Sequence, residues 1–133
     1  MKQSLLQEKY PVFHLELEKS ETTFNNVDEI IAYLKQQIDE HKIASYIATF
    51  DHYAHTKALE EHSIADDILD AQNIIFCFGI ALPNANVLAV RPRSIGVAET
   101  PTGFVINFME APMPVANQAM EHWVLSLRNK QVA

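Results

Sequence analysis

The sequence predicts an α+β fold, in which a curved, mainly antiparallel sheet of about five strands carries two main amphipathic helices on one face. Three observations support this prediction. Residues 10–18 alternate between apolar and polar side chains, which is the period of a half-buried strand. Residues 27–38 and 116–127 repeat apolar side chains at helical spacing, so each helix has one apolar stripe. A Thr-Pro-Thr-Gly turn at 100–103 indicates a hairpin. Two layers are enough to bury one stripe per helix and one face of a sheet.

The first half of the chain predicts a strand, a helix and a second strand. Pro11 suits the start of the first strand, where a missing N–H does least harm. Asn26 is expected to cap the first helix, with Glu29 completing a capping box. A second strand is expected at 43–50. One or two short helices, at 56–62 and 63–69, are expected before the third strand.

The second half predicts three more strands and a helix. The unbroken apolar run 73–78 is typical of a central strand that is covered on both faces. Residues 87–99 are expected to be extended, with Pro92 at a strand start, an edge or a bulge. The last strand is expected at 104–109. Pro114 suits the first position of a C-terminal helix that runs to about Asn129, after which the chain is expected to fray.

Length and charge restrict the classes of function. The 133 residues correspond to one domain, residues 1–133, at roughly 100–200 residues per domain. A formal charge of −7 argues against general binding of nucleic acid. We find no N-terminal signal peptide and no apolar run of the ~20 residues that span a bilayer, so we expect a soluble, cytoplasmic protein without membrane contact. The single cysteine, Cys77, excludes an internal disulfide and fits a reducing compartment.

Three stretches together carry a resemblance to a known family. Asp51-His52 ends the second strand, an apolar strand closes with Gly79, and a proline-led strand around Pro92 precedes a hairpin. Together they resemble an uncharacterised bacterial family of small domains of unknown function with a TATA-box-binding-protein-like α/β fold. The resemblance covers roughly residues 27–112 and implies a curved sheet backed by helices, without an established activity. This chain departs from the family pattern, since Arg91 and Arg93 flank the proline where the family usually has apolar residues.

The stretch Thr49–Thr56 is the first candidate site. Asp51 is a natural N-cap residue, and in that interpretation the histidines are its hydrogen-bonded neighbours. In the functional alternative, Asp51 orients His52 as a general base, or His52 and His55 contribute to a metal set. A zinc site would usually need three or four ligands, and no second cluster is visible.

The Arg91-Pro92-Arg93 segment is the most distinctive positive feature of an acidic chain. In a strand, Arg91 and Arg93 would point to the same face. They would either pair with carboxylates such as Glu99 or Glu110, or form a fork for a carboxylate or phosphate ligand. Cys77, in an apolar strand, is expected to behave as a small hydrophobe.

Three functions follow from these candidates. The first is a small soluble domain that binds a small anionic ligand or a protein partner. Its ligand-binding residues would be Asp51, His52, His55, Arg91 and Arg93, and a homodimer would form through sheet edges or faces. The second is a small hydrolase or isomerase, with Asp51 and His52 as catalytic candidates and an arginine that stabilises charge. The third is a metal-binding protein that uses His52 and His55. No cofactor is expected.

Overall fold

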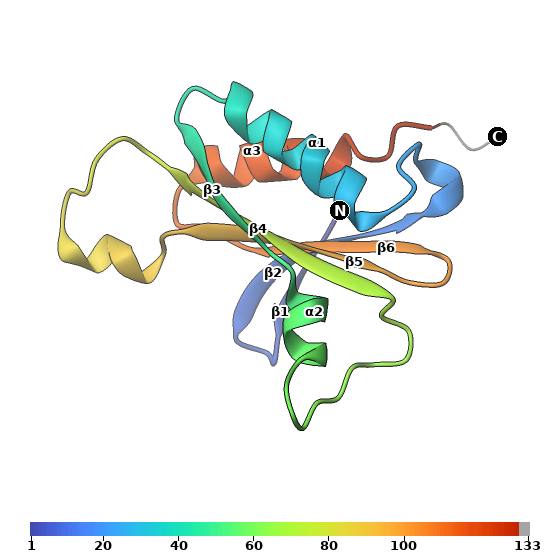
Figure 1. Ribbon diagram of the computed structural model, residues 1–133. Coiled ribbons are helices and arrows are strands. Elements are labelled where there is room, and N and C mark those ends of the chain that lie inside the picture. The colour runs from blue at the N-terminus through green and yellow to red at the C-terminus, as the bar shows by residue number, and fades with distance from the viewer. Residues whose placement is uncertain (131–133) are drawn as a thin grey trace.

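The computed structural model describes residues 1–130 and has the expected α+β class (Figure 1). Its strands form one antiparallel sheet in the order β1-β2-β6-β5-β4-β3. The strands are β1 (Lys2–Leu6), β2 (Tyr10–Glu18), β3 (Ala44–Phe50), β4 (Asp70–Phe78), β5 (Arg93–Glu99) and β6 (Gly103–Met109). The α-helices are α1 (Val27–Glu40), α2 (His52–Lys57) and α3 (Pro114–Leu125), and the 3-10 helices are η1 (Lys19–Glu21) and η2 (Ala85–Ala89).

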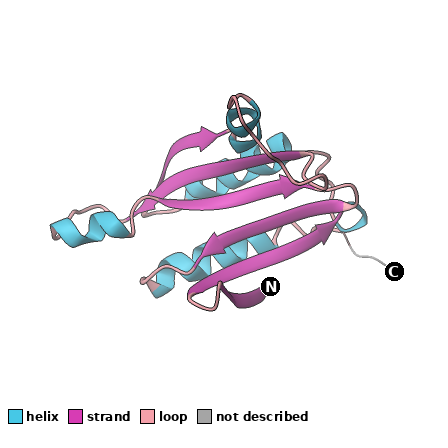
Figure 2. Ribbon diagram, turned by 90° about the horizontal axis from the view of Figure 1, so that it is seen from below, coloured by secondary structure: helices cyan, strands magenta, loops and turns pink. Residues whose placement is uncertain are grey.

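Helices α1 and α3 lie side by side on one face of the sheet, and the opposite face is turned toward the viewer in Figure 2. We call that opposite face the open face. The core fills the space between the two helices and the sheet. It contains the side chains that alternate inward from the strands, such as Leu15, Ile74, Phe76, Ile95, Val97 and Ile106. The helices supply the other half of the core, including Ile30, Leu34, Ile38, Met120, Trp123 and Val124.

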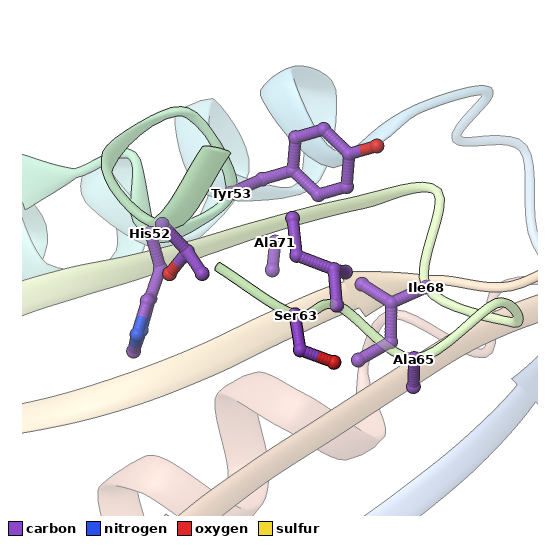
Figure 3. A pocket seen from close by; sticks show the side chains of 8 residues that line it. His52, Tyr53, Ser63, Ala65, Ile68 and Ala71 are labelled. Atoms are coloured by element: carbon purple, nitrogen blue, oxygen red, sulfur yellow. The ribbon is translucent and has the colours of Figure 1, made fainter. Parts of the chain in front are cut away.

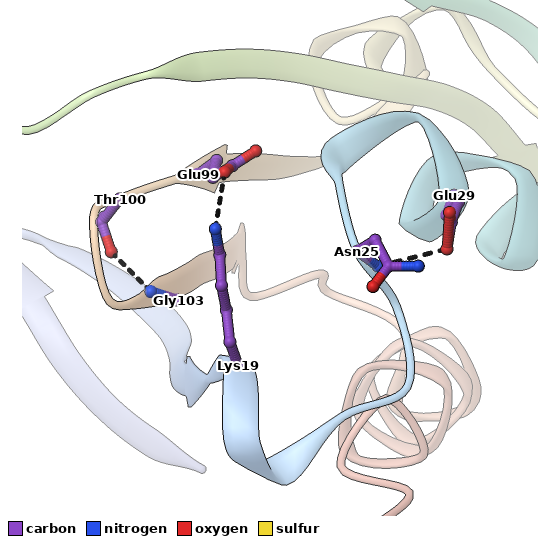
Figure 4. Close-up of polar contacts among 6 residues, drawn as sticks. All are labelled: Lys19, Asn25, Glu29, Glu99, Thr100 and Gly103. Atoms are coloured by element: carbon purple, nitrogen blue, oxygen red, sulfur yellow. Dashed lines mark hydrogen bonds and ion pairs between the residues drawn. The ribbon is translucent and has the colours of Figure 1, made fainter.

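Helix α1 begins where the capping residues predict. The side chain of Asn26 accepts a hydrogen bond from the backbone N–H of Glu29, at 2.9 Å. The side chain of Glu29 returns to the backbone N–H of Asn25 at 3.1 Å, one residue before the cap (Figure 4). Two N–H groups at the helix start are therefore satisfied by side chains, which is what a capping box does.

The β5–β6 hairpin is also as expected, and its turn is closed by polar contacts drawn in Figure 4. The backbone N–H of Gly103 donates to the Thr100 hydroxyl at 3.1 Å, and the backbone N–H of Thr100 donates to the Gly103 carbonyl at 2.8 Å. Lys19 forms an ion pair with Glu99, with a 2.9 Å distance between nitrogen and oxygen.

The sheet has six strands, roughly consistent with the expected number of about five, and the additional strand is β1. Residues Lys2–Leu6 pair antiparallel with β2, yet every one of them is exposed. An exposed outer strand needs no alternation of apolar residues, since backbone hydrogen bonds hold it. The sequence pattern that reveals a half-buried strand is therefore absent here.

The first short helix was expected at 56–62, but the structure has it earlier in the chain. Helix α2 covers His52–Lys57, and no helix forms at 58–69 in the structure. Asp51 caps the helix directly after the end of β3, so the residues that were expected to connect the strand to a later helix are themselves helical.

The prediction that residues 73–78 are covered on both faces was wrong. Strand β4 lies between β3 and β5, and its residues alternate between buried and half-buried. Helix α1 packs on its inner face, and α2 contacts the strand through the hydrogen bond of His52 to Asn73. Ile75 and Cys77, whose side chains point to the open face, are only half-buried. An apolar run alone does not distinguish these two situations.

The prediction of one extended stretch at 87–99 was also wrong for residues 87–92, which precede the strand. Residues Ala85–Ala89 form η2, and β5 starts only at Arg93, after a cis peptide bond between Arg91 and Pro92. Helix α3 ends at Leu125, four residues before the expected Asn129. The expected fraying at the C-terminus concerns residues 131–133, which lie outside the described residues. None of the helices within residues 1–130 is long and apolar enough to span a membrane.

Candidate functional site

Asp51 is a helix cap. Its carboxylate accepts a hydrogen bond from the backbone N–H of Ala54 at 2.9 Å, and the residue stands at the N-cap of α2. The neighbouring His52 makes its side-chain hydrogen bond to Asn73 instead, with 3.2 Å between Nδ1 and Oδ1. This geometry gives no support to a catalytic pair in which Asp51 orients His52.

We predict that Asp51→Ala destabilises the protein by about 1 kcal/mol, the usual cost of losing an N-cap side chain. Asp51→Asn is the matched control, because it removes the charge and keeps an oxygen that can cap. Urea unfolding at pH 7 measures the difference. Equal stability of the two variants would contradict the capping role.

His52 and His55 both pack on the ring of Phe50, at the end of β3. The centroid distances are 5.0 Å for His52 and 5.2 Å for His55. The two imidazoles thus share a neighbour, as the helical spacing predicts. No group of three or more His, Cys, Asp or Glu side chains that could hold a metal ion occurs within residues 1–130.

A first cavity, of about 250 Å³, lies between α2 and the segment that leads to β4 (Figure 3). Its polar groups are those of His52, Tyr53, Thr56 and Ser63. The rest of its lining is aliphatic, from Ile64, Ala65, Ile68 and Ala71. Asp51, His55 and the two arginines do not line it.

Arg91 ties together the two ends of the loop at 79–92. Its Nη1 donates to the carbonyl of Ala81 at 2.6 Å. The guanidinium also lies against Gly79, where a Cβ atom would sit 3.2 Å from Nη2. Gly79 has a φ of 98°, a backbone conformation that glycine adopts without strain.

Arg93 is half-buried and binds backbone carbonyls. Its Nη1 donates to Val90 at 3.1 Å, and its Nη2 donates to Met109 at 2.6 Å and to Glu110 at 3.1 Å. Its Nε is buried without a hydrogen-bond partner within residues 1–130. Burial lowers the pKa of Arg93 from its ordinary value, but a guanidinium stays charged at neutral pH.

The expected ion pairs of these arginines with Glu99 or Glu110 do not form. Glu99 pairs with Lys19, and Glu110 offers Arg93 only its backbone carbonyl. The ion pairs within residues 1–130 are Lys19–Glu99, Lys35–Asp39 and Arg128–Glu21, so neither Arg91 nor Arg93 takes part in one. In the part of the chain that the structure describes, neither guanidinium therefore has a carboxylate partner, although the protein is acidic.

Arg91 and Arg93 line the same cavity, of about 230 Å³, which we call the loop-base cavity. It lies between the loop at 79–92 and the start of α3. The remaining lining is mainly apolar, from Phe78, Val87, Val90, Ala111, Met113 and Ala116. The sequence does not reveal that residues 111–116 form one side of this cavity, because they are far from the loop in the chain and meet it only in the folded structure.

The five expected ligand-binding residues are not brought together. His52 lines the cavity beside α2, and the arginines line the loop-base cavity. Phe50, just before Asp51, pairs with Asn73, whereas Arg93 pairs with Phe76. Residues 73 and 76 are an odd number of positions apart along β4, so their side chains point to opposite faces of the sheet.

Cys77 lies on the open face of β4 and is half-buried. Its Sγ is 3.7 Å from the carbonyl oxygen of Phe78, which is a weak hydrogen bond at most.

The acidic residues near the start of β4 repel one another. The pKa of Asp70 is raised, first by burial and then by the charges of Asp51, Asp28 and Glu99, although the N–H of Ala71 opposes the shift. A carboxyl group with a raised pKa in the folded state favours folding only while it is protonated. Its contribution is complete below the ordinary value of 3.8 and is lost as the pH rises through the folded-state pKa.

We therefore predict that Asp70→Asn raises the melting temperature at pH 7, because it removes a carboxylate that the fold disfavours. The side chain of asparagine can still accept from the N–H of Ala71. The stabilisation should shrink toward zero near pH 3, where Asp70 is protonated in both states. Thermal unfolding of both proteins between pH 3 and pH 7 measures this, and a difference that does not depend on pH would contradict it.

Comparison with known proteins gives one match. The model of a family described as a family of unknown function (DUF6858) matches residues 1–129. No curated protein and no solved structure matches the chain.

Proposed function

We propose that this chain, which belongs to the DUF6858 family of unknown function, binds a small organic carboxylate in the loop-base cavity. The observation that carries this proposal is that two guanidinium groups without carboxylate partners line one mainly apolar cavity. The ligand anion would provide the negative charge that both arginines lack within residues 1–130.

Arg91 is the residue that would bind the carboxylate. A guanidinium has five N–H donors, and the protein uses one nitrogen of Arg91, Nη1, for the carbonyl of Ala81. The remaining donors can reach an anion in the bidentate arrangement that arginine forms with carboxylates. Arg93 uses both Nη atoms for backbone carbonyls, so its role would be to add positive charge from the inner wall.

The apolar lining supports a carboxylate with an apolar body. Val87, Val90 and Met113 would contact the body while the charged head meets Arg91. Drug-sized ligands occupy pockets of roughly 300–1,000 Å³, so a cavity of about 230 Å³ suits a smaller molecule. Benzoate has both features and is a suitable probe.

Thermal unfolding with three probes tests the proposal. At tenfold excess over its dissociation constant, benzoate should stabilise the protein by about 1.4 kcal/mol, which raises the melting temperature. Benzamide has the same shape without the charge, and acetate has the charge without the apolar body. We expect both to give much smaller shifts. Equal shifts with benzamide, or none with benzoate, would remove the proposal.

A protein partner is the second candidate, and the loop at 79–92 favours it. Ile80 is 93 % exposed, Leu82 is 71 % exposed and Leu88 is 61 % exposed. Exposed apolar side chains that gather on one segment often mark an interaction surface. The expected homodimer through sheet edges also remains a proposal, with β1 and β3 as the outer strands of the sheet. Sedimentation equilibrium of the purified protein would detect a dimer.

From the sequence we further propose a fold like that of TATA-box-binding-protein-like domains, a bacterial origin, a cytoplasmic location and an organisation as one domain. The absence of nucleic-acid and membrane partners also remains a prediction from the charge and the hydropathy.

A further inference from the structure

The open face of the sheet carries a row of residues from neighbouring strands. Gly96 in the middle of β5 is opposite Asn107 on β6 and Asn73 on β4. The row continues outward to His14 beside Asn107 and to Phe50 beside Asn73. Gly96 belongs to the open face because the residues on either side of it, Ile95 and Val97, are buried in the core.

The two carboxamides flank the backbone of Gly96. A Cβ atom at this position would lie 3.1 Å from Oδ1 of Asn107 and 3.4 Å from Nδ2 of Asn73, so both polar atoms lie close to Gly96. A ligand that rests on the outer surface of Gly96 could therefore meet an acceptor and a donor together. This surface, which we call the hollow, is part of a surface cavity of about 290 Å³, whose lining also includes Ser94, Pro92 and Met109.

The amide of Asn73 is held in one orientation by its neighbours. Its Oδ1 lies 3.2 Å from Nδ1 of His52, and the His52 ring packs on Phe50. When Nδ1 carries its proton it donates to Oδ1, and the NH₂ group of Asn73 then faces the hollow. The hydrogen bonds found within residues 1–130 leave that NH₂ group and the Oδ1 atom of Asn107 without a partner in the protein.

The polar groups that a ligand could meet in the hollow are uncharged. Arg93 is the one ionisable side chain in its lining, and both Nη atoms of Arg93 are bound to backbone carbonyls. A ligand would therefore be recognised by a donor and an acceptor that lie side by side. The carbonyl of a cyclic amide or imide would accept from Asn73, and its adjacent N–H would donate to Asn107.

We propose that the hollow over Gly96 is a binding site for a small, neutral, planar cyclic amide or imide, a class that includes pyrimidine bases. The two asparagines supply the complementary donor and acceptor, and the surface cavity that they line together with Gly96 supplies the room. This site shares Val90 and Arg93 with the lining of the loop-base cavity, but the two asparagines that define it line only the site over Gly96. The proposal does not depend on the function proposed for the loop-base cavity.

Nitrogen-15 NMR titration with uracil tests this proposal, with 1,3-dimethyluracil as the matched probe. Dimethylation keeps both carbonyls and removes both N–H donors. We expect uracil to give saturable shifts at the backbone amide of Gly96 and the side-chain NH₂ of Asn73. We expect 1,3-dimethyluracil to bind at least about tenfold more weakly, which is 1.4 kcal/mol.

Two variants complete the test. Gly96→Ala fills the hollow, and its methyl group meets only the ends of two side chains, so the fold should be kept. Ala98→Val adds carbon atoms to the same strand and face, two residues away. Uracil binding should be lost in Gly96→Ala and unchanged in Ala98→Val, with both melting temperatures measured alongside.

Three results would overturn the proposal. They are no saturable shift with uracil, equal binding of 1,3-dimethyluracil, and unchanged binding in Gly96→Ala. Sedimentation equilibrium could also show that the wild type is a dimer and that Gly96→Ala is a monomer. That result would assign the row of residues to an interface with a second copy of the chain, and it would also overturn the proposal.

Discussion

Phe76→Ala is expected to destabilise the protein by about 3–5 kcal/mol, the usual cost of removing a buried phenylalanine side chain. Phe76 is 0 % exposed, and its ring centroid lies 5.7 Å from that of Phe78 and 5.8 Å from that of Trp123. The three rings join the inner face of β4 to α3. Removing the ring of Phe76 leaves a cavity that the rigid sheet cannot close.

Phe50→Ala is the matched control for that substitution. Phe50 is 36 % exposed on the open side of β3, where it contacts His52 and His55. Because less area is returned to water, its loss should cost about 1 kcal/mol. Urea unfolding measures both free energies, and a similar cost for the two variants would contradict the core described above.

Gly103→Ala is the second substitution for which we expect a large effect. A Cβ atom at Gly103 would overlap the carbonyl oxygen of Leu17 and would lie 2.9 Å from Cα of Glu18. These are backbone atoms of β2, which pairs with β6, so relief requires the two strands to separate locally. We expect a loss of about 3 kcal/mol, at the upper end of the cost of overpacking.

Gly96→Ala is the control here as well. Its added methyl group would meet Oδ1 of Asn107 at 3.1 Å and Nδ2 of Asn73 at 3.4 Å, which are ends of side chains that can move. We expect a change within about 0.5 kcal/mol, as for most substitutions on a surface. Thermal unfolding should therefore show a melting temperature for Gly103→Ala lower by roughly 10 °C and almost no change for Gly96→Ala.

The sequence predicts best where a physical pattern is local. Helix α1 could be predicted because Asn26, Glu29 and the apolar stripe that follows all favour the same start and face. Strand β2 was predicted from its alternation, and in residues 15–18 the buried Leu15 and Leu17 alternate with the exposed Glu16 and Glu18. In both cases the burial against the core repeats with the period of the element itself.

The loop at 79–92 could not be predicted in the same way. Val87 to Val90 looks like part of a strand, but Leu88 is exposed and the segment forms a 3-10 helix. Its shape depends on Arg91, which donates a hydrogen bond to the carbonyl of Ala81. That contact leaves no periodic signal in the sequence.

Part of the candidate site has a counterpart in the structure. Arg91 and Arg93 were singled out as neighbours from the sequence, and both line one cavity. The expected reason, that both side chains point from one strand, does not hold, because Arg91 precedes β5. The grouping with Asp51, His52 and His55 does not form, since the pairing register of β4 with β3 and β5 decides which face each side chain takes.

Calorimetric titration of benzoate into the wild type and Arg91→Gln tests the proposed function most directly. We predict one site per chain, and binding at least about tenfold weaker in Arg91→Gln, a difference of 1.4 kcal/mol. Lys57→Gln, which removes a positive charge on α2 outside the cavity, should bind as the wild type does. If benzoate binds equally to Arg91→Gln, or does not bind to the wild type, the loop-base cavity is not a carboxylate site.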